Sequence, residues 1–320
     1  MSSAHLVDPE LAPLLELFPT IAFSTDLLPM IRSREIPVRD DPAVTARVAM
    51  ETRMVPGPKG AAEVSVRMYT PREGQFVRPC ILHFHGGGYV TGSAAMMDPV
   101  HRALALEMDC VIVSVDYRLA PETPFPGGIE DCYAALAWLV NEAPRLRVDS
   151  GRIGVMGESA GGGLAAALAL LARDRREYRL AFQHLIYPML DDRTCVSVNP
   201  HPFAGEYIWT PRNNTFGWTA LLSRPPGSDG VSMYAAAARA EDLSGLPKTF
   251  ISSGALDLFL EEDIEYARRL MRQGVPVEMH VYPGAYHAFD LAFDARVAAD
   301  AHRDSCSALR RALHPSPAAL

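Results

Sequence analysis

A serine and a run of glycines are the residues of this chain best suited to chemistry. Gly157-Glu158-Ser159-Ala160-Gly161 fits the G-x-S-x-G pattern, in which a serine stands on a tight turn between a strand and a helix. His85-Gly86-Gly87-Gly88 fits the glycine loop that supplies backbone N–H groups to the same kind of site. Each segment follows an apolar run, and together they indicate a serine nucleophile equipped for acyl transfer.

The residues around Ser159 explain how the hydroxyl would be presented and how charge would be stabilised. Small neighbours favour the sharp turn, and the helix that follows places its positive end at the serine. Gly86 and Gly87 can aim N–H groups at an oxyanion, and Ala160 supplies a third donor. Taken alone, each segment could be a chance glycine turn. The role of His85 stays open between holding this loop and a simple strand-end histidine.

A serine also needs a base that takes its proton. Of the ten histidines, His287 stands apart because it follows the apolar run 277–282 through a Pro-Gly turn. That position predicts a loop at the carboxyl edge of a sheet, near the serine turn. A surface role is the alternative for this histidine.

An acid should hold the imidazole in one tautomer. Asp257 lies just past the apolar run 248–252, and the order serine, aspartate, histidine is that of α/β hydrolases. Asp191 and Asp192 also follow a strand and compete for this role. Glu261 is interpreted as a helix-start residue favoured by the helix dipole.

Apolar runs alternate with helical stretches along most of the chain. Such alternation predicts βαβ units and an α/β fold with a mostly parallel central sheet, covered by helices on both faces. The expected strands are residues 63–69, 80–84, 110–115, 153–156, 182–187, 248–252 and 277–282. The expected helices are residues 98–108, 129–142, 160–173 and 261–273.

Two segments lack this alternation of strands and helices and predict a helical cap. We expect an N-terminal cap segment at 1–50, a first part of the α/β-hydrolase core at 51–190, a cap insertion at 191–240 and the second part of the core at 241–320. The first segment is interpreted as short helices separated by proline-containing loops. Tyr89, Phe203, Trp209 and Phe216 are candidates to bind substrate, with packing inside the cap as the alternative.

The composition excludes several classes of function. The 320 residues carry a formal net charge of −8 with no long basic run, which argues against nucleic acid and anionic membranes as partners. No apolar run approaches the ~18 residues of a membrane span, and no secretory signal is recognised. Five cysteines without a C-x-x-C pair make a disulfide framework or zinc site improbable and predict a cytoplasmic protein.

Five motifs together resemble the bacterial hormone-sensitive-lipase family of esterases. They are 85–89 with Gly92, 116–122, 157–162, Asp257 with Glu261, and 282–289. The resemblance implies a carboxylic ester hydrolase that prefers short to medium acyl chains and has a helical cap and no cofactor. It also implies that Tyr117 and Arg118 are structural, and Glu158 is a variation whose role stays open between electrostatic tuning and a structural hydrogen bond.

The expected function is therefore hydrolysis of small-molecule carboxylic esters through Ser159, His287 and Asp257 and an acyl-enzyme, with no cofactor and no metal. Two alternatives stay open: cleavage of amides or carbamates by the same triad, and a non-catalytic small-molecule receptor on the same fold. The last strand and a final helix near residues 292–313 could form the interface of a homodimer.

Overall fold

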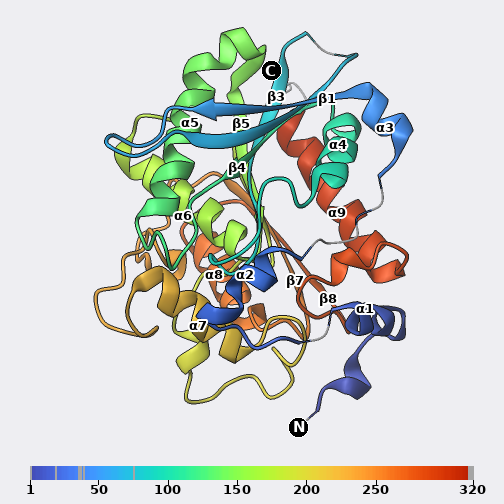
Figure 1. Cartoon of the computed structure of the whole chain (residues 1–320), viewed down its shortest axis with the longest axis vertical. Helices are drawn as coiled ribbons and strands as arrows, with labels where there is room; N and C mark the ends of the chain where they lie inside the picture. Colours follow the sequence, from blue (N-terminus) through green and yellow to red (C-terminus); the bar gives the residue numbers. More distant parts are fainter. Residues whose placement is uncertain (1, 19, 35–37, 39, 75, 316–320) are drawn as a thin grey trace.

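A central sheet of eight strands organises the molecule, as seen in a computed structural model that describes residues 2–18, 20–34, 38, 40–74 and 76–315 (Figure 1). Its strand order is β1-β2-β4-β3-β5-β6-β7-β8. The strands are β1 (Val48–Val55), β2 (Val64–Pro71), β3 (Arg78–Phe84), β4 (Val111–Asp116), β5 (Val148–Glu158), β6 (Phe182–Ile186), β7 (Lys248–Gly254) and β8 (Val277–Tyr282).

The predicted mostly parallel sheet is confirmed. Only β2 runs antiparallel to its neighbours β1 and β4, and every pair from β4 to β8 is parallel. All seven residues of β3 are buried, which explains the apolar run at its centre: a central strand covered on both faces has no exposed side.

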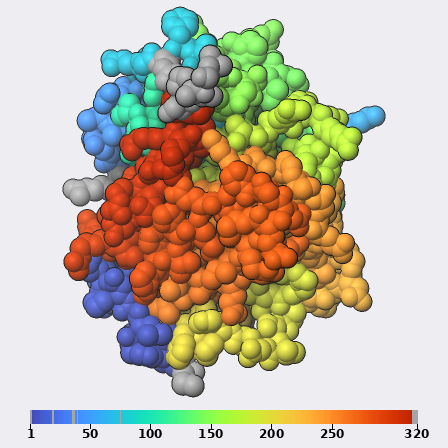
Figure 2. Space-filling model, turned by 180° about the vertical axis from the view of Figure 1, so that it is seen from behind, coloured from blue at the N-terminus to red at the C-terminus, as the bar shows by residue number. Residues whose placement is uncertain are grey.

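Two helical layers enclose the sheet. Alternate residues of a strand pack against opposite layers. Leu82 lies in the core that includes α5 (Gly127–Leu146) and α6 (Ala160–Arg175). Its neighbour Ile81 lies in the core that includes α4 (Asp98–Glu107) and α9 (Arg296–Leu313). The remaining α-helices are α1 (Ala12–Leu17), α2 (Leu28–Arg32), α3 (Pro42–Arg47), α7 (Pro211–Leu222) and α8 (Leu260–Arg272). Seen from behind, the orange and red C-terminal third covers much of one face (Figure 2).

The helices α1, α2 and α7 lie toward one end of the molecule (Figure 1). Asn213 of α7 joins them, because its Oδ1 accepts from the Phe23 N–H and its Nδ2 donates to the Ile21 carbonyl, both at 2.9 Å. Arg32 of α2 ties the same segment to the core by donating to the carbonyls of Val90 and Ala120. Residues far apart in sequence therefore form one layer over the sheet end.

One strand, β1, was not expected from the sequence. It is an edge strand with a mostly exposed or half-exposed middle, so its sequence lacks an apolar signature. Among the described residues, none of the helices combines the length and the apolar character that a bilayer crossing requires.

Candidate active site

Ser159 stands on a strained turn between β5 and α6. Its φ of +55° is a conformation that non-glycine residues rarely adopt, and it lifts the side chain out of the sheet. The turn is fixed by backbone bonds, since the Ser159 N–H donates to Ile186 and its carbonyl accepts from Met189. A Cβ at Gly161 would overlap the Phe84 carbonyl, so the strand, turn and helix approach this closely only with glycine there.

A chain of hydrogen bonds joins the three residues that the sequence singled out. The Nε2 of His287 lies 3.0 Å from the Ser159 hydroxyl oxygen, and its Nδ1 lies 2.8 Å from Oδ2 of Asp257. Asp257 is fully buried, and Ser159 and His287 are each 5% exposed. Three positions spread over 128 residues thus meet within hydrogen-bonding distance in a nearly dry setting.

Asp257 determines which nitrogen of His287 carries the proton. Its Oδ1 accepts from the Phe259 N–H at 2.9 Å, which leaves Oδ2 as the acceptor for His287 Nδ1–H. The lone pair of Nε2 then faces the serine hydroxyl, as a general base requires. Backbone bonds from Ala255 to Tyr282 and from Leu256 to Ala285 hold the two loops together.

The glycine loop lies directly against the serine. A Cβ at Gly86 would stand 3.5 Å from Cβ of Ser159, and Gly87 has a φ of +120° that suits only glycine. Ala160 is the first residue of α6, so its N–H belongs to the donors at the helix start. Gly86 and Ala160 therefore adjoin the nucleophile and Gly87 follows Gly86 in the same loop, so backbone N–H groups there would be candidates to stabilise an oxyanion.

His85 holds this loop and takes no part in the hydrogen-bond chain described above. Its Nδ1–H donates to the Gly86 carbonyl at 2.8 Å, and its ring stacks on Tyr117 at 4.3 Å between centroids. Burial lowers the pKa of His85 to about 4, so the ring is neutral near pH 7. Tyr117 in turn donates to the His85 carbonyl. Arg118 forms a bidentate pair with buried Asp131. These contacts fit the structural roles expected for Tyr117 and Arg118.

The competing acids have other partners. Asp192 is fully buried and accepts from the Arg239 guanidinium at 2.6 and 2.8 Å. Asp191 pairs with Arg193. Glu261 is exposed in the first turn of α8, where the helix dipole favours an acid. The geometry favours Asp257 as the partner of His287.

Two further carboxylates, Glu158 and Asp290, lie near the triad. Oε2 of Glu158 lies 2.9 Å from Nε2 of His83, whose Nδ1 lies 2.9 Å from the Ser114 hydroxyl oxygen. Glu158 is therefore held by a structural hydrogen bond next to the nucleophile. Asp290 accepts from the Tyr187 hydroxyl at 2.7 Å, and burial raises its pKa to about 6.

An aromatic row leads away from the base. The ring of Trp209 lies 6.3 Å from that of His287, Phe23 lies 5.5 Å from Trp209, and Phe216 lies 6.3 Å from Phe23. Trp209 is fixed by a hydrogen bond from its Nε1 to Asn214. The row ends at an open hollow of about 360 Å³ lined partly by Phe216, which falls in the size range of ligand pockets.

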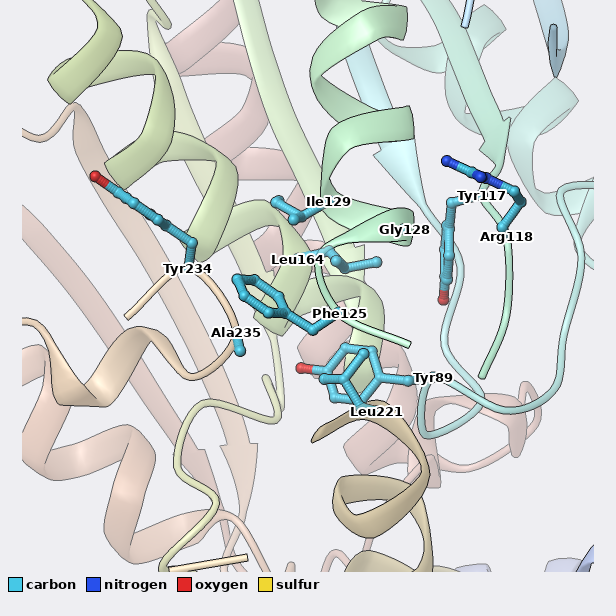
Figure 3. A pocket seen from close by; sticks show the side chains of 10 residues that line it. All are labelled: Tyr89, Tyr117, Arg118, Phe125, Gly128, Ile129, Leu164, Leu221, Tyr234 and Ala235. Atoms are coloured by element: carbon cyan, nitrogen blue, oxygen red, sulfur yellow. The ribbon is translucent and has the colours of Figure 1, made fainter. Parts of the chain in front are cut away.

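Tyr89 and Phe203 lie elsewhere. Tyr89 is 2% exposed, packs beside Trp218 and donates its hydroxyl proton to the Met189 carbonyl. The cavity that it lines with Leu221 is about 10 Å³, room for about one water molecule (Figure 3). The ring contacts of Phe203 are to His5 and His201.

Several residues that support the site were not recognised in the sequence. Glu262, buried behind the triad loops, accepts from the N–H groups of Leu190 and Asp191 at 2.6 and 3.2 Å. Asn213 and Asn214 hold Phe23 and Trp209. Polar residues near a helix start are common in any sequence, so only their contacts reveal these roles.

Comparisons with known proteins agree with this geometry. A family model for the alpha/beta hydrolase fold matches residues 81–291. Carboxylesterase NlhH of Mycobacterium tuberculosis is 36% identical over 314 residues, covering 96% of this chain and 97% of that protein. Esterase LipI of the same organism is 33% identical over 317 residues, covering 96% of both. A solved bacterial heroin esterase superimposes with a TM-score of 0.87 at 38% identity, covering 97% of this chain and 98% of its own.

The chain therefore belongs to the α/β-hydrolase fold family. The similarity extends over nearly the whole chain and confirms the resemblance to the esterases of the hormone-sensitive-lipase type.

Proposed function

We propose that this protein is a serine carboxylesterase that hydrolyses small carboxylic esters through an acyl-enzyme on Ser159. The observation that carries the proposal is the hydrogen-bond chain from Ser159 through His287 to Asp257. Its similarity to named esterases over nearly the whole chain supports the same reaction. No step of this reaction calls for a cofactor.

Each residue has a defined part in the two steps. His287 takes the proton of Ser159 as the hydroxyl oxygen attacks the ester carbonyl, and Gly86, Gly87 and Ala160 donate to the oxyanion. His287 then protonates the leaving alcohol. Water, activated by the same imidazole, releases the acid and restores the hydroxyl. Asp257 stabilises the imidazolium that forms in both steps.

The substrate pocket is proposed to follow the aromatic row from Trp209 to Phe216. Short to medium acyl chains suit this path, since the hollow at its end is about 360 Å³. In this proposal Phe203 and Tyr89 support the walls and do not touch substrate, because their ring partners are His5, His201 and Trp218 and not residues of the row. The described N-terminal residues as far as α2 and residues 191–240 act together as the cap, supported by the Asn213 bonds to Ile21 and Phe23, whereas the end of the expected segment 1–50 joins the sheet as β1 from Val48.

Two further expectations stay predictions. A homodimer through β8 and α9 is compatible with β8 lying at the sheet edge. A cytoplasmic location is compatible with all five cysteines being free thiols.

The test is a series of p-nitrophenyl esters from acetate to palmitate, measured with the native enzyme and with Ser159→Ala. We expect the highest kcat/KM at short to medium chains and loss of activity by about a million-fold in the variant, as in an analogous triad. Matched ester and anilide substrates separate ester hydrolysis from amide cleavage. Ligand-induced stabilisation without turnover of any ester would instead indicate a receptor.

A further inference from the structure

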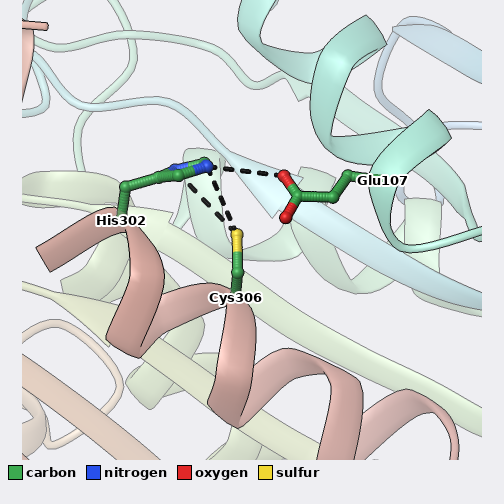
Figure 4. Close-up of side chains that lie close together, drawn as sticks. All are labelled: Glu107, His302 and Cys306. Carbon is green, nitrogen blue, oxygen red and sulfur yellow. Dashed lines mark hydrogen bonds and ion pairs between the residues drawn. The ribbon is translucent and has the colours of Figure 1, made fainter. Parts of the chain in front are cut away.

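Three potential metal ligands of different kinds meet on the side of the sheet covered by α4 and α9. Glu107 is the last residue of α4, and His302 and Cys306 lie one turn apart on α9 (Figure 4). Residues four apart project from the same helix face, so α9 offers a nitrogen and a sulfur together. A carboxylate oxygen, the imidazole nitrogen and the thiol sulfur all lie within 4.8 Å of one another.

Two of the separations are close to those between ligands of one tetrahedral ion. Nε2 of His302 lies 3.4 Å from Oε2 of Glu107 and 3.5 Å from Sγ of Cys306. Typical zinc bond lengths and tetrahedral angles give about 3.3 Å between nitrogen and oxygen ligands and about 3.6 Å between nitrogen and sulfur. The helices therefore bring the three side chains close enough to share an ion, but Sγ also lies 3.9 Å from Nδ1 of the same ring, so the His302 imidazole must turn on its side chain to aim Nε2 at that ion.

The surroundings orient the carboxylate. Arg310 donates to Oε1 of Glu107 at 2.7 Å, which leaves Oε2 facing His302. Such outer contacts typically fix the orientation of metal ligands. His302 is 63% exposed on its side chain and Glu107 is 37% exposed, so an ion can enter from solvent and keep a water as fourth ligand. Cys306 lies beneath them, 1% exposed, in the core between helix and sheet.

We propose that Glu107, His302 and Cys306 form a binding site for Zn²⁺ that fastens α4 to α9. The donor set of one carboxylate, one imidazole and one thiolate suits a borderline-soft ion better than Mg²⁺ or Ca²⁺, which take oxygen ligands. On binding, the Cys306 thiol proton leaves to the buffer and a sulfur–zinc bond forms, without any redox change. The two anionic ligands balance the charge of the ion.

The proposed zinc site lies outside the catalytic machinery, so metal binding is measured by absorption spectroscopy and by thermal unfolding. The purified enzyme, stripped with EDTA and desalted, is titrated with Co²⁺, which stands in for zinc. We expect one equivalent to give intense tetrahedral d–d bands and a thiolate-to-cobalt charge-transfer band, both removed by Zn²⁺. Zn²⁺ should also raise Tm, because it binds the folded chain.

Three variants identify the ligands. His302→Ala, at an exposed position, should fold normally and lose the charge-transfer band, and Cys306→Ser should lose it as well. Cys195→Ser, at the one cysteine that is not buried, should keep it. Absence of a thiolate band at saturating Co²⁺, or a band of unchanged affinity in His302→Ala, would overturn the proposal. The esterase rate of each variant is expected to match that of the native enzyme.

Discussion

Replacing Asp257 by asparagine removes one charge while keeping the shape of the side chain. The carboxylate has two tasks in the structure: Oδ1 accepts from the Phe259 N–H, and Oδ2 accepts from Nδ1–H of His287. The new amide can keep the first bond with its oxygen, and its NH₂ group then faces Nδ1. Nδ1 must accept from it, so the ring proton moves to Nε2, which can no longer take the proton of Ser159.

The expected loss of activity follows from a His287 ring that carries its proton on the wrong nitrogen. The equivalent change in an analogous triad lowers kcat by about 10⁴, which is about 5 kcal/mol of transition-state stabilisation. We expect a similar loss in kcat for p-nitrophenyl butyrate with Asp257→Asn, with KM changed little because the carboxylate does not face the pocket. Thermal unfolding should show that the variant is folded.

Asp191→Asn is the matched control, since Asp191 also follows a strand but its half-buried carboxylate pairs with Arg193. Its kcat/KM should stay within about twofold of the native value, because its partner is Arg193 and not the base. If Asp257→Asn kept more than a tenth of the native kcat, or if Asp191→Asn lost as much, Asp257 would not orient the base.

Three further predictions concern packing, pH and specificity. Gly161→Ala should lower the free energy of unfolding by about 3 kcal/mol or more, because its Cβ meets the Phe84 carbonyl, whereas Gly151→Ala, near only the Asp149 side chain, should unfold like the native chain in urea. Burial lowers the pKa of His184 from 6.5 to about 3, so the unfolded chain binds a proton there that the folded chain does not. Stability should therefore fall as pH drops below 6.5, and His184→Gln should flatten the profile between pH 7.5 and 5 by about 2 kcal/mol; identical profiles would contradict this. Trp209→Ala should shift the ester preference toward longer acyl chains while Phe203→Ala should not, and equal shifts in both would place the pocket elsewhere.

Much of the fold was predictable because its strands are buried on both faces. β3 and β4 each contain a run of mostly apolar residues, and such runs are typical of a parallel sheet covered on both faces. β1 escaped prediction because an exposed edge strand has no such run. The position of β1 depends on pairing with β2 along its full length. The local sequence does not encode this pairing, because it is a tertiary contact.

The candidate site also contains some residues that the sequence reveals and others that it does not. Ser159 and the glycines were recognisable because backbone geometry restricts the residue types there. Glu262 and Asn214 were not, because a buried hydrogen bond can be made by many polar residues at many positions. Chain order does not separate Asp257 from Asp191, since both lie between Ser159 and His287, and the structure favours Asp257 by one 2.8 Å contact to His287.

The most direct test of the central claim is covalent labelling of the nucleophile. A fluorophosphonate is added in increments to the native enzyme, and residual esterase activity is compared with the phosphonylated residue found by peptide mass spectrometry. We expect activity to fall in proportion to one label per chain, with the label on Ser159 and none after His287→Ala. Full inactivation with the label on another residue, or a labelled Ser159 in an enzyme that keeps its activity, would contradict the assignment.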